Sequence, residues 1–337
     1  MSSVKKKSTK ISPDELISFF SLAAKNKIPL FYLEWVKSHT NSIPELSEEH
    51  EVLKHNEENV SSQIEEIALI LGNKGINYAF FKTIKPFPYI GSDIDLLFFG
   101  SDSQKKAMKL FTENGYLFLD SGPRNFTMRN PRTAIKIDLY GEITVSRVSY
   151  LSKEKFDECV IEVSYDDVVI PVLTPQAELV SVIAHSFYKE QMYTLADFYT
   201  IILTLSILSP SQIKSFIELV RAQKIEFACS VSLALTEVVH NSAFGKTIES
   251  IDEILSNFCF GPLIVSGTRR ALANLATEKM PIKHDYMTVL LGLIEKNLKD
   301  KRTRRSIPVQ IKQMISSPNF IKGFIEHLLL HAHRETY

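Results

Sequence analysis

The alternation of apolar and polar positions divides the chain into a helical beginning, a strand-rich middle and a helical end. Apolar residues recur at helical spacing over residues 12–27, over 31–39, and from Ser47 to Gly72. Ser12-Pro13, with acids directly after them, is a signal that begins a helix. We therefore expect helices throughout the region that precedes the first strand.

The pattern becomes strand-like after Gly75. A helix over residues 103–115 interrupts the run of strands and ends at a glycine. An order of helix, strands, helix and further strands is typical of a mixed sheet with helices packed on it. We predict an α+β fold with a small mixed sheet and helices on one face. The expected strands are 76–83, 93–99, 116–120, 125–130, 133–143 and 160–174, the last divided by a turn at Asp166-Asp167.

The chain returns to helical spacing after Thr174 and keeps it for most of its remaining length. Pro175 suits the first position of a helix, and Thr174 suits the cap before it. The change of pattern predicts three regions. They are an N-terminal tail with helices (1–58), the α+β core (59–173) and a C-terminal helical domain (174–337).

Composition and charge restrict the class of protein. The chain has 337 residues, with 39 Lys and Arg against 39 Asp and Glu, so its formal net charge is zero. That balance does not demand a nucleic acid or an anionic membrane as partner. The most apolar run, residues 195–209, is interrupted by Asp197, and the basic N-terminus lacks an apolar segment behind it. We expect a protein that does not enter a membrane.

Three cysteines lie far apart and form no Cys-x-x-Cys pair. An odd number of widely spaced cysteines is a poor disulfide framework. We therefore expect a cytoplasmic location. The sequence leaves the oligomeric state open. The cysteines are Cys159, Cys229 and Cys259.

Two acids stand one step apart in an otherwise apolar strand, "DIDLLFF". Residues two apart in a strand face the same side, so Asp93 and Asp95 project together. Asp138 has the same place in "AIKIDLY", and the three carboxylates converge if the two strands are neighbours. Clustered carboxylates repel one another unless a cation neutralises them, and Mg²⁺ or Mn²⁺ prefers such oxygen ligands. The pattern predicts a metal site.

These residues resemble the nucleotidyltransferase superfamily, of which DNA polymerase beta is the best-known member. The superfamily has a pair of small residues, a short spacer, Asp-hydrophobic-Asp, and a third Asp on a later strand. A closer resemblance is to the uncharacterised nucleotidyltransferase family, whose signature reads roughly Leu-Lys-Gly, a spacer with Tyr and Pro, then Ser-Asp-Ile-Asp-Leu-Leu. Residues 80–98, "FFKTIKPFPYIGSDIDLLF", are similar in order and spacing. The resemblance covers roughly Val60 to Ile202.

The resemblance implies roles for the acidic residues. Asp93 and Asp95 would hold the metal, which brings a nucleoside triphosphate such as ATP. Asp138 would complete the metal site and orient or deprotonate the hydroxyl of an acceptor.

It also implies that Lys82, Thr83 and Ser92 contact the nucleotide. Lys82-Thr83 stands where the superfamily has Gly-Ser or Gly-Gly. An ion pair between Lys82 and Asp93 or Asp95 is the alternative role for the lysine.

Residues 173–201 resemble the family's next segment, in which a "Pro-Glu" helix with a histidine precedes a "Leu-x-Asp" helix. Gln176 stands where an acid is usual. By this resemblance His185, Lys189 and Asp197 belong to the nucleotide cleft. The alternative is that His185 and Asp197 only pack and bond between helices.

The sequence thus predicts a metal-dependent nucleotidyltransferase that moves a nucleoside monophosphate from an NTP to a hydroxyl acceptor. The acceptor, whether tRNA, another protein or a small molecule, stays open. One alternative is a catalytically degenerate relative that acts as a binding or antitoxin-like protein. A second is an Asp-x-Asp glycosyltransferase, which would need a larger βαβ region before the motif. His327 and His331 have metal-ligand spacing but lack a third ligand nearby.

Overall fold

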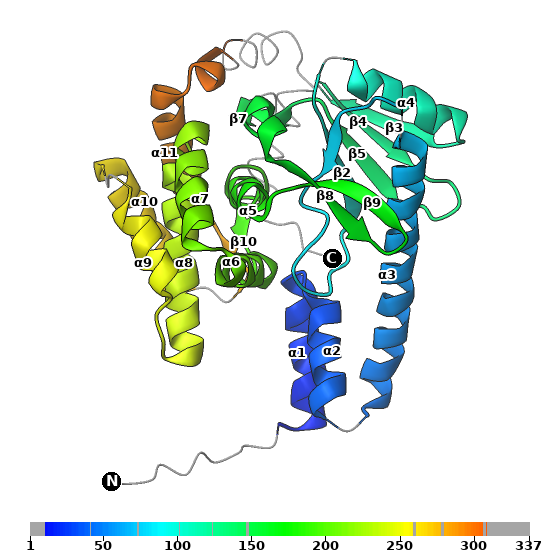
Figure 1. Ribbon diagram of the computed structural model, residues 1–337. Helices are drawn as coiled ribbons and strands as arrows, with labels where there is room; N and C mark the ends of the chain where they lie inside the picture. The colour runs from blue at the N-terminus through cyan, green and yellow to red at the C-terminus, as the bar shows by residue number, and fades with distance from the viewer. Residues whose placement is uncertain are drawn as a thin grey trace, which may run out of the picture.

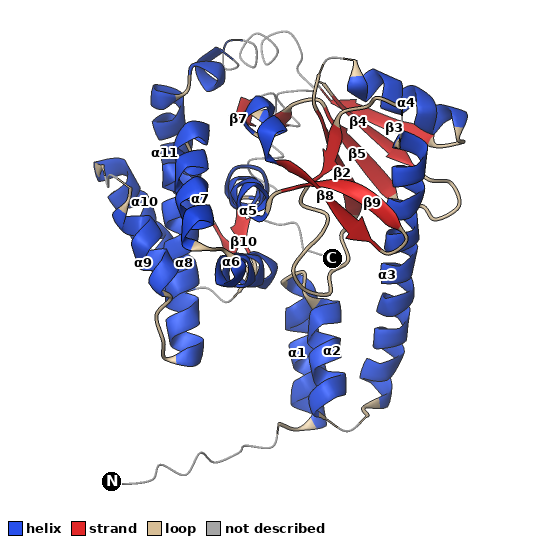
Figure 2. Cartoon of the chain, in the orientation of Figure 1, coloured by secondary structure: helices blue, strands red, loops and turns tan. Residues whose placement is uncertain are grey.

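In the computed structural model, a mixed seven-stranded sheet lies between helix α3 (Pro44–Leu71) and the C-terminal helices, towards the upper right of Figures 1 and 2. The structure describes residues 11–305 and 308, apart from residues 41, 73, 101, 123, 146–147, 259–260 and 278–279. The predicted α+β class is confirmed. None of the described helices combines the length and the apolarity needed to cross a lipid bilayer.

Helices α1 (Pro13–Lys25), α2 (Pro29–His39) and α3 (Pro44–Leu71) precede the first strand, as the pattern predicts. The Ser12 hydroxyl accepts the backbone N–H of Glu15, and the Glu15 carboxylate accepts the N–H of Ser12, so the two residues form a capping box. Helix α3 runs through residue 59, where the sequence suggests a boundary, and carries its apolar face onto the sheet.

The sheet has two parallel pairs, β2 with β5 and β1 with β9, and its other pairs are antiparallel. The strand expected over 76–83 is shorter at both ends, and on its C-terminal side the backbone of Lys82 takes a left-handed conformation (φ 61°) outside the β region. The hairpin of β6 (Ile143–Val145) and β7 (Val148–Leu151) was not predicted. The sheet order is β3 (Leu117–Gly122), β4 (Asn125–Arg129), β5 (Lys136–Tyr140), β2 (Asp93–Phe98), β1 (Tyr78–Phe80), β9 (Val168–Leu173) and β8 (Val160–Tyr165).

Helices cover both faces of this sheet, so the prediction of helices on one face is wrong. Helices α3 and α4 (Ser103–Glu113) pack on one face, and α5 (Pro175–Ala184) packs on the other (Figure 1). The reason lies in β2, in which every residue from Ile94 to Phe98 is buried. Residues that point to opposite sides of a strand can all be buried only if packed elements cover both faces.

The described residues after Thr174 are mostly helical, and they form the larger hydrophobic core with one face of the sheet. A π-helical segment, His185–Glu190, continues α5 directly. Thr174 stands at the N-cap of α5 with Pro175 after it, as predicted, but the Thr174 side chain makes no capping bond there. The remaining elements are β10 (Met192–Tyr193), α6 (Leu195–Ile207), α7 (Pro210–Gln223), α8 (Glu226–Phe244), α9 (Glu249–Ser256), α10 (Pro262–Thr277), β11 (Ile282–Lys283) and α11 (Tyr286–Lys299).

The loop between β1 and β2 is anchored to the N-terminal helices and to α6. Phe87, in the middle of this loop, packs against Phe31 of α2 and Tyr199 of α6, with ring centroids 5.2 and 6.2 Å away. The side chain of Asn26, at the end of α1, accepts the backbone N–H of Leu195 at 3.1 Å. The ring contacts of Phe87 hold the loop before β2, and the Asn26 bond joins α1 to α6, against which that ring packs.

We expect Phe87→Ala to lower the free energy of unfolding by roughly 3 kcal/mol, the usual cost of removing a buried aromatic ring. Phe87 is almost fully buried, so the substitution leaves a cavity between the loop, α2 and α6. Urea unfolding of the two proteins measures the difference. Phe87→Leu is the matched control and should lose less. A change below about 1 kcal/mol in the alanine variant would show that the loop is not anchored by this ring.

Candidate metal centre

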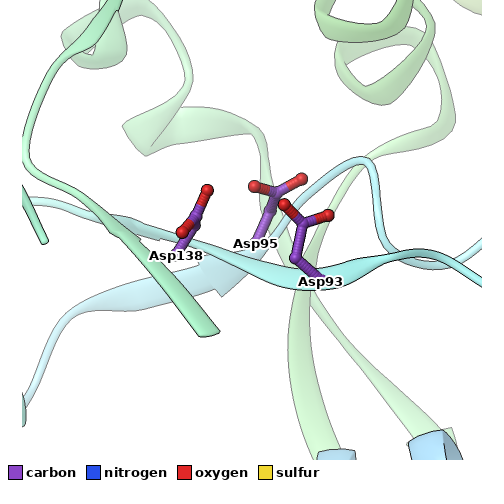
Figure 3. A group of neighbouring side chains, drawn as sticks. All are labelled: Asp93, Asp95 and Asp138. Carbon is purple, nitrogen blue, oxygen red and sulfur yellow. The ribbon is translucent and has the colours of Figure 1, made fainter. Parts of the chain in front are cut away.

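The parallel pairing of β2 with β5 brings the three predicted acids together. In the register, Asp95 lies beside Asp138 and Asp93 lies beside Lys136. One carboxylate oxygen from each of the three acids lies within 4.8 Å of the others. Figure 3 shows the three side chains projecting to the same side of their strands. This is the face that α5 covers, since Leu97 and Tyr140, which have the same strand parity, belong to that core.

Asp95 is the most buried of the three acids, at 7% exposure. Its Oδ2 forms an ion pair with the Nζ of Lys82 at 3.0 Å. Its Oδ1 is buried and has no hydrogen-bond partner among the described residues. Burial raises the pKa of Asp95 to about 6, even though the Lys82 charge acts in the opposite direction. A cation could bind this oxygen without displacing a hydrogen-bond donor of the described residues.

In the metal-free protein, we expect Asp95 to make folding less favourable as the pH rises. Its pKa is raised from 3.8 to about 6, so the folded state binds this proton more tightly than the unfolded state does. The protonated carboxyl of Asp95 therefore adds to the free energy of unfolding. This contribution is complete below pH 4 and is lost as the pH rises through 6. A tenfold change in proton affinity is worth about 1.4 kcal/mol, so the loss amounts to roughly 3 kcal/mol.

Urea unfolding of the wild type and of Asp95→Asn at pH 4 and pH 7 measures this contribution. The asparagine cannot titrate. As the pH rises from 4 to 7, the unfolding free energy of the variant should therefore increase relative to that of the wild type. If both proteins show the same pH dependence, the carboxyl of Asp95 does not titrate in this way.

Asp138 is held by two hydroxyl groups. Thr127 of β4 donates to its Oδ1 at 2.6 Å, and Tyr140 donates to its Oδ2 at 3.3 Å. Burial raises the pKa of Tyr140 well above its usual range, so its hydroxyl keeps the proton that it donates. Lys189 in turn donates to the Tyr140 oxygen at 3.0 Å. These two hydrogen bonds fix the direction of the Asp138 carboxylate.

Lys82 makes the ion pair that the sequence left as an alternative, and its backbone explains how. The Oε1 of Glu178, in the first turn of α5, accepts the N–H of Lys82 at 2.7 Å. This bond fixes the left-handed backbone that a glycine would take at no steric cost. The amine then lies over the rings of Phe81 and Tyr140, 4.6 and 4.8 Å from their centroids.

His185 and Lys189 contact neighbours of the acidic cluster, His185 through the amine of Lys82 and Lys189 through the hydroxyl of Tyr140. The Nζ of Lys82 lies 3.3 Å from the Nδ1 of His185. Because an ammonium group can only donate, Nδ1 must accept, and the ring proton therefore lies on Nε2, which donates to Glu190 at 3.1 Å. Burial, reinforced by the charge of Lys82, lowers the pKa of His185 well below its usual range, so this ring is neutral.

The other predicted residues have different places. The hydroxyl of Thr83 is buried and accepts the backbone N–H of Asp95 at 2.9 Å, so it joins the end of β1 to β2. Ser92 is exposed and donates to Asp93 at 3.1 Å. Asp197 forms a capping box with Thr194 at the start of α6. Its bonds belong to this cap, which agrees with the structural alternative for Asp197.

Sequence reasoning did not single out Glu178, Tyr140 and Glu190 as members of the site. Glu178 is separated from its partner Lys82 by 96 positions in the chain, and the sequence shows it only as an acid in the first turn of a helix. Tyr140 shares the face of Asp138 in the strand pattern, which is a usable signal. The sequence holds no comparable signal for Glu190.

The donor set fits a hard divalent cation, since three carboxylates converge and one buried oxygen has no partner among the described residues. No second such cluster of His, Cys, Asp and Glu occurs in the described part of the chain. His327 and His331 lie outside the described residues. No family model matches this chain, and no curated protein matches it.

Proposed function

We propose that this chain is a metal-dependent nucleotidyltransferase that transfers a nucleoside monophosphate from an NTP to a hydroxyl acceptor. One observation carries the proposal: the pairing of β2 with β5 sets Asp95 beside Asp138, with Asp93 near both. The order of motifs in residues 80–98, which resembles that of the uncharacterised nucleotidyltransferase family, supports the reaction class.

Asp93, Asp95 and Asp138 would hold Mg²⁺ or Mn²⁺ in this proposal. The bound cation supplies neutralisation of the charge on the triphosphate and on the departing pyrophosphate. Asp93, which is partly exposed at the start of β2, presents its carboxylate on the solvent side of the cluster. Asp95 contributes the buried oxygen that has no partner among the described residues.

The proposed step is the attack of an acceptor hydroxyl oxygen on the α-phosphorus of the NTP. A new oxygen–phosphorus bond forms, the bond from the α-phosphorus to the bridging oxygen breaks, and pyrophosphate leaves. The hydroxyl proton passes to the carboxylate of Asp138, which Thr127 and Tyr140 keep oriented. Lys82 and Lys189 place two ammonium groups on this side of the sheet, where they attract the phosphates.

A non-catalytic binding protein is the second candidate, and one observation favours it. The amine of Lys82 already neutralises Asp95 in the structure, as it would in a core that no longer binds metal. The glycosyltransferase alternative is less well supported, because the described residues before β1 form the helices α1, α2 and α3 and include no βαβ unit.

Incubation of the protein with each labelled NTP, Mg²⁺ or Mn²⁺ and a total cell extract tests the proposal. We expect one NTP to transfer label to one fraction of the extract, namely tRNA, protein or small molecules. The same experiment with Asp93→Asn, which removes one carboxylate, should give no label. If the wild type binds an NTP but labels no fraction, the non-catalytic alternative is correct.

A further inference from the structure

Lys82 places an ammonium group among the carboxylates of the candidate metal centre. Its Nζ lies 3.0 Å from the Oδ2 of Asp95, and the residue is 8% exposed. If the amine of Lys82 moved out into solvent, it would lose its ion pair with Asp95 and its contacts with the rings of Phe81 and Tyr140. The ammonium group therefore occupies the Oδ2 side of the Asp95 carboxylate, a group that a metal ion at this centre would also bind.

The surroundings hold this ammonium group in place from several elements. Glu178 of α5 fixes the backbone of Lys82 through its N–H, as described above. His185 of the π-helical segment offers its Nδ1 as an acceptor at 3.3 Å. Asp95 of β2, Tyr140 of β5 and His185 all contact the amine itself, so its position is built into the fold.

We propose that Lys82 is a specificity-determining residue of the metal centre, because it competes with a free divalent cation for Asp95 and gives way when the cation arrives with a triphosphate. The phosphate oxygens would then accept the displaced ammonium group. This inference deepens the proposed function and rests on it for the role of a triphosphate. The competition between Lys82 and a free divalent cation for Asp95 does not depend on that function.

The electrostatic reason is simple. Two cations that share one buried carboxylate repel each other, and their repulsion is strong where little water screens it. A triphosphate adds several negative charges beside the same amine, so the ammonium group gains a new partner when it leaves Asp95. The metal centre should therefore bind a free divalent cation weakly and the same cation tightly when a nucleoside triphosphate accompanies it.

Titration with Mn²⁺ alone, followed by the electron paramagnetic resonance signal of the free ion, tests the competition. Lys82→Met keeps the length and the apolar stem of the side chain but removes the charge. We expect this variant to bind Mn²⁺ roughly tenfold more tightly than the wild type, or better, because a charged hydrogen bond to Asp95 no longer has to be displaced. Lys189→Met is the matched control. Its amine donates to the Tyr140 hydroxyl, so the control should stay within roughly threefold of the wild type.

Equal or weaker Mn²⁺ binding by Lys82→Met would overturn the inference. So would an equal gain in Lys189→Met, since that result would reflect only the general loss of positive charge. The titration contains no nucleotide and no acceptor, so it separates the two proposals. Tighter binding by Lys82→Met in a protein that transfers no label would leave the competition intact and remove the proposed function.

A measurement on the unaltered chain covers the case in which Lys82→Met does not fold. An amine displaced from Asp95 becomes accessible, so saturating Mn²⁺ should increase the acetylation of Lys82 by an N-hydroxysuccinimide ester several-fold, as mapped by mass spectrometry. Lys105 of α4, which is exposed and belongs to the helix on the opposite face of the sheet, serves as an internal control and should not change. Unchanged labelling of Lys82 at saturating Mn²⁺ would overturn the competition.

Discussion

Asp95→Asn is expected to lower the rate of nucleotidyl transfer by roughly 10³-fold or more. The substitution removes one charged ligand from the place where the triphosphate charge must be neutralised, and such neutralisation is worth several kcal/mol in the transition state. It also leaves Lys82 with an uncharged neighbour in place of its ion-pair partner. The rate is measured by label incorporation into the acceptor fraction at saturating Mg²⁺.

The same variant should lose the stabilisation that the metal and nucleotide give to the wild type. A ligand that binds only the native state raises the melting temperature, so Mg²⁺ with an NTP should stabilise the wild type and not Asp95→Asn. Asp120→Asn makes the same chemical change at an exposed position of β3 and should behave as the wild type in both measurements. An equal thermal shift in Asp95→Asn would remove Asp95 from the metal centre.

Asp138→Ala should separate catalysis from binding. We expect it to keep most of the affinity for nucleotide and to lose transfer by about 10²-fold or more, because help from a general base is felt in the transition state. Calorimetry gives the affinity, and label incorporation on the same preparation gives the rate. The loss should appear in kcat when the acceptor is saturating.

Thr127→Val is the control for this prediction, since it removes the hydrogen bond to Asp138 but keeps the carboxylate. We expect a smaller loss of rate there, about tenfold at most, the value of one hydrogen bond to a charged group. If Asp138→Ala abolishes nucleotide binding as well, Asp138 is a primary ligand of the nucleotide-bound metal and has no separate role as a base.

The sequence was sufficient to predict the convergence of the three acids, because strand periodicity is a local property. Two strands that each carry acids on one face need only lie side by side, and β2 and β5 do. The order of helices and strands was predictable for the same reason. Helices on both faces of the sheet were not predicted from the sequence. The uninterrupted apolar run after Asp95 is a signal that could have indicated them.

The contacts around Lys82 could not be predicted, because they depend on tertiary structure. A lysine in a strand pattern gives no sign that its backbone will turn to a positive φ, and this conformation depends on Glu178 in a distant helix. Likewise, the sequence shows Thr83 as a hydroxyl beside a lysine, while the fold uses that hydroxyl to bond the backbone of Asp95. Propensity gives way to tertiary contacts at both positions.

A crystal of the full chain grown with Mn²⁺ and a non-hydrolysable NTP analogue tests the central claim most directly, through the anomalous scattering of manganese. We predict an anomalous peak within about 2.3 Å of carboxylate oxygens of both Asp93 and Asp95, the range of metal–oxygen bonds for such ions, with the triphosphate on the same side of the sheet. A peak at another place, or nucleotide bound away from these two residues, would contradict the assignment of this acidic cluster as the metal and nucleotide site.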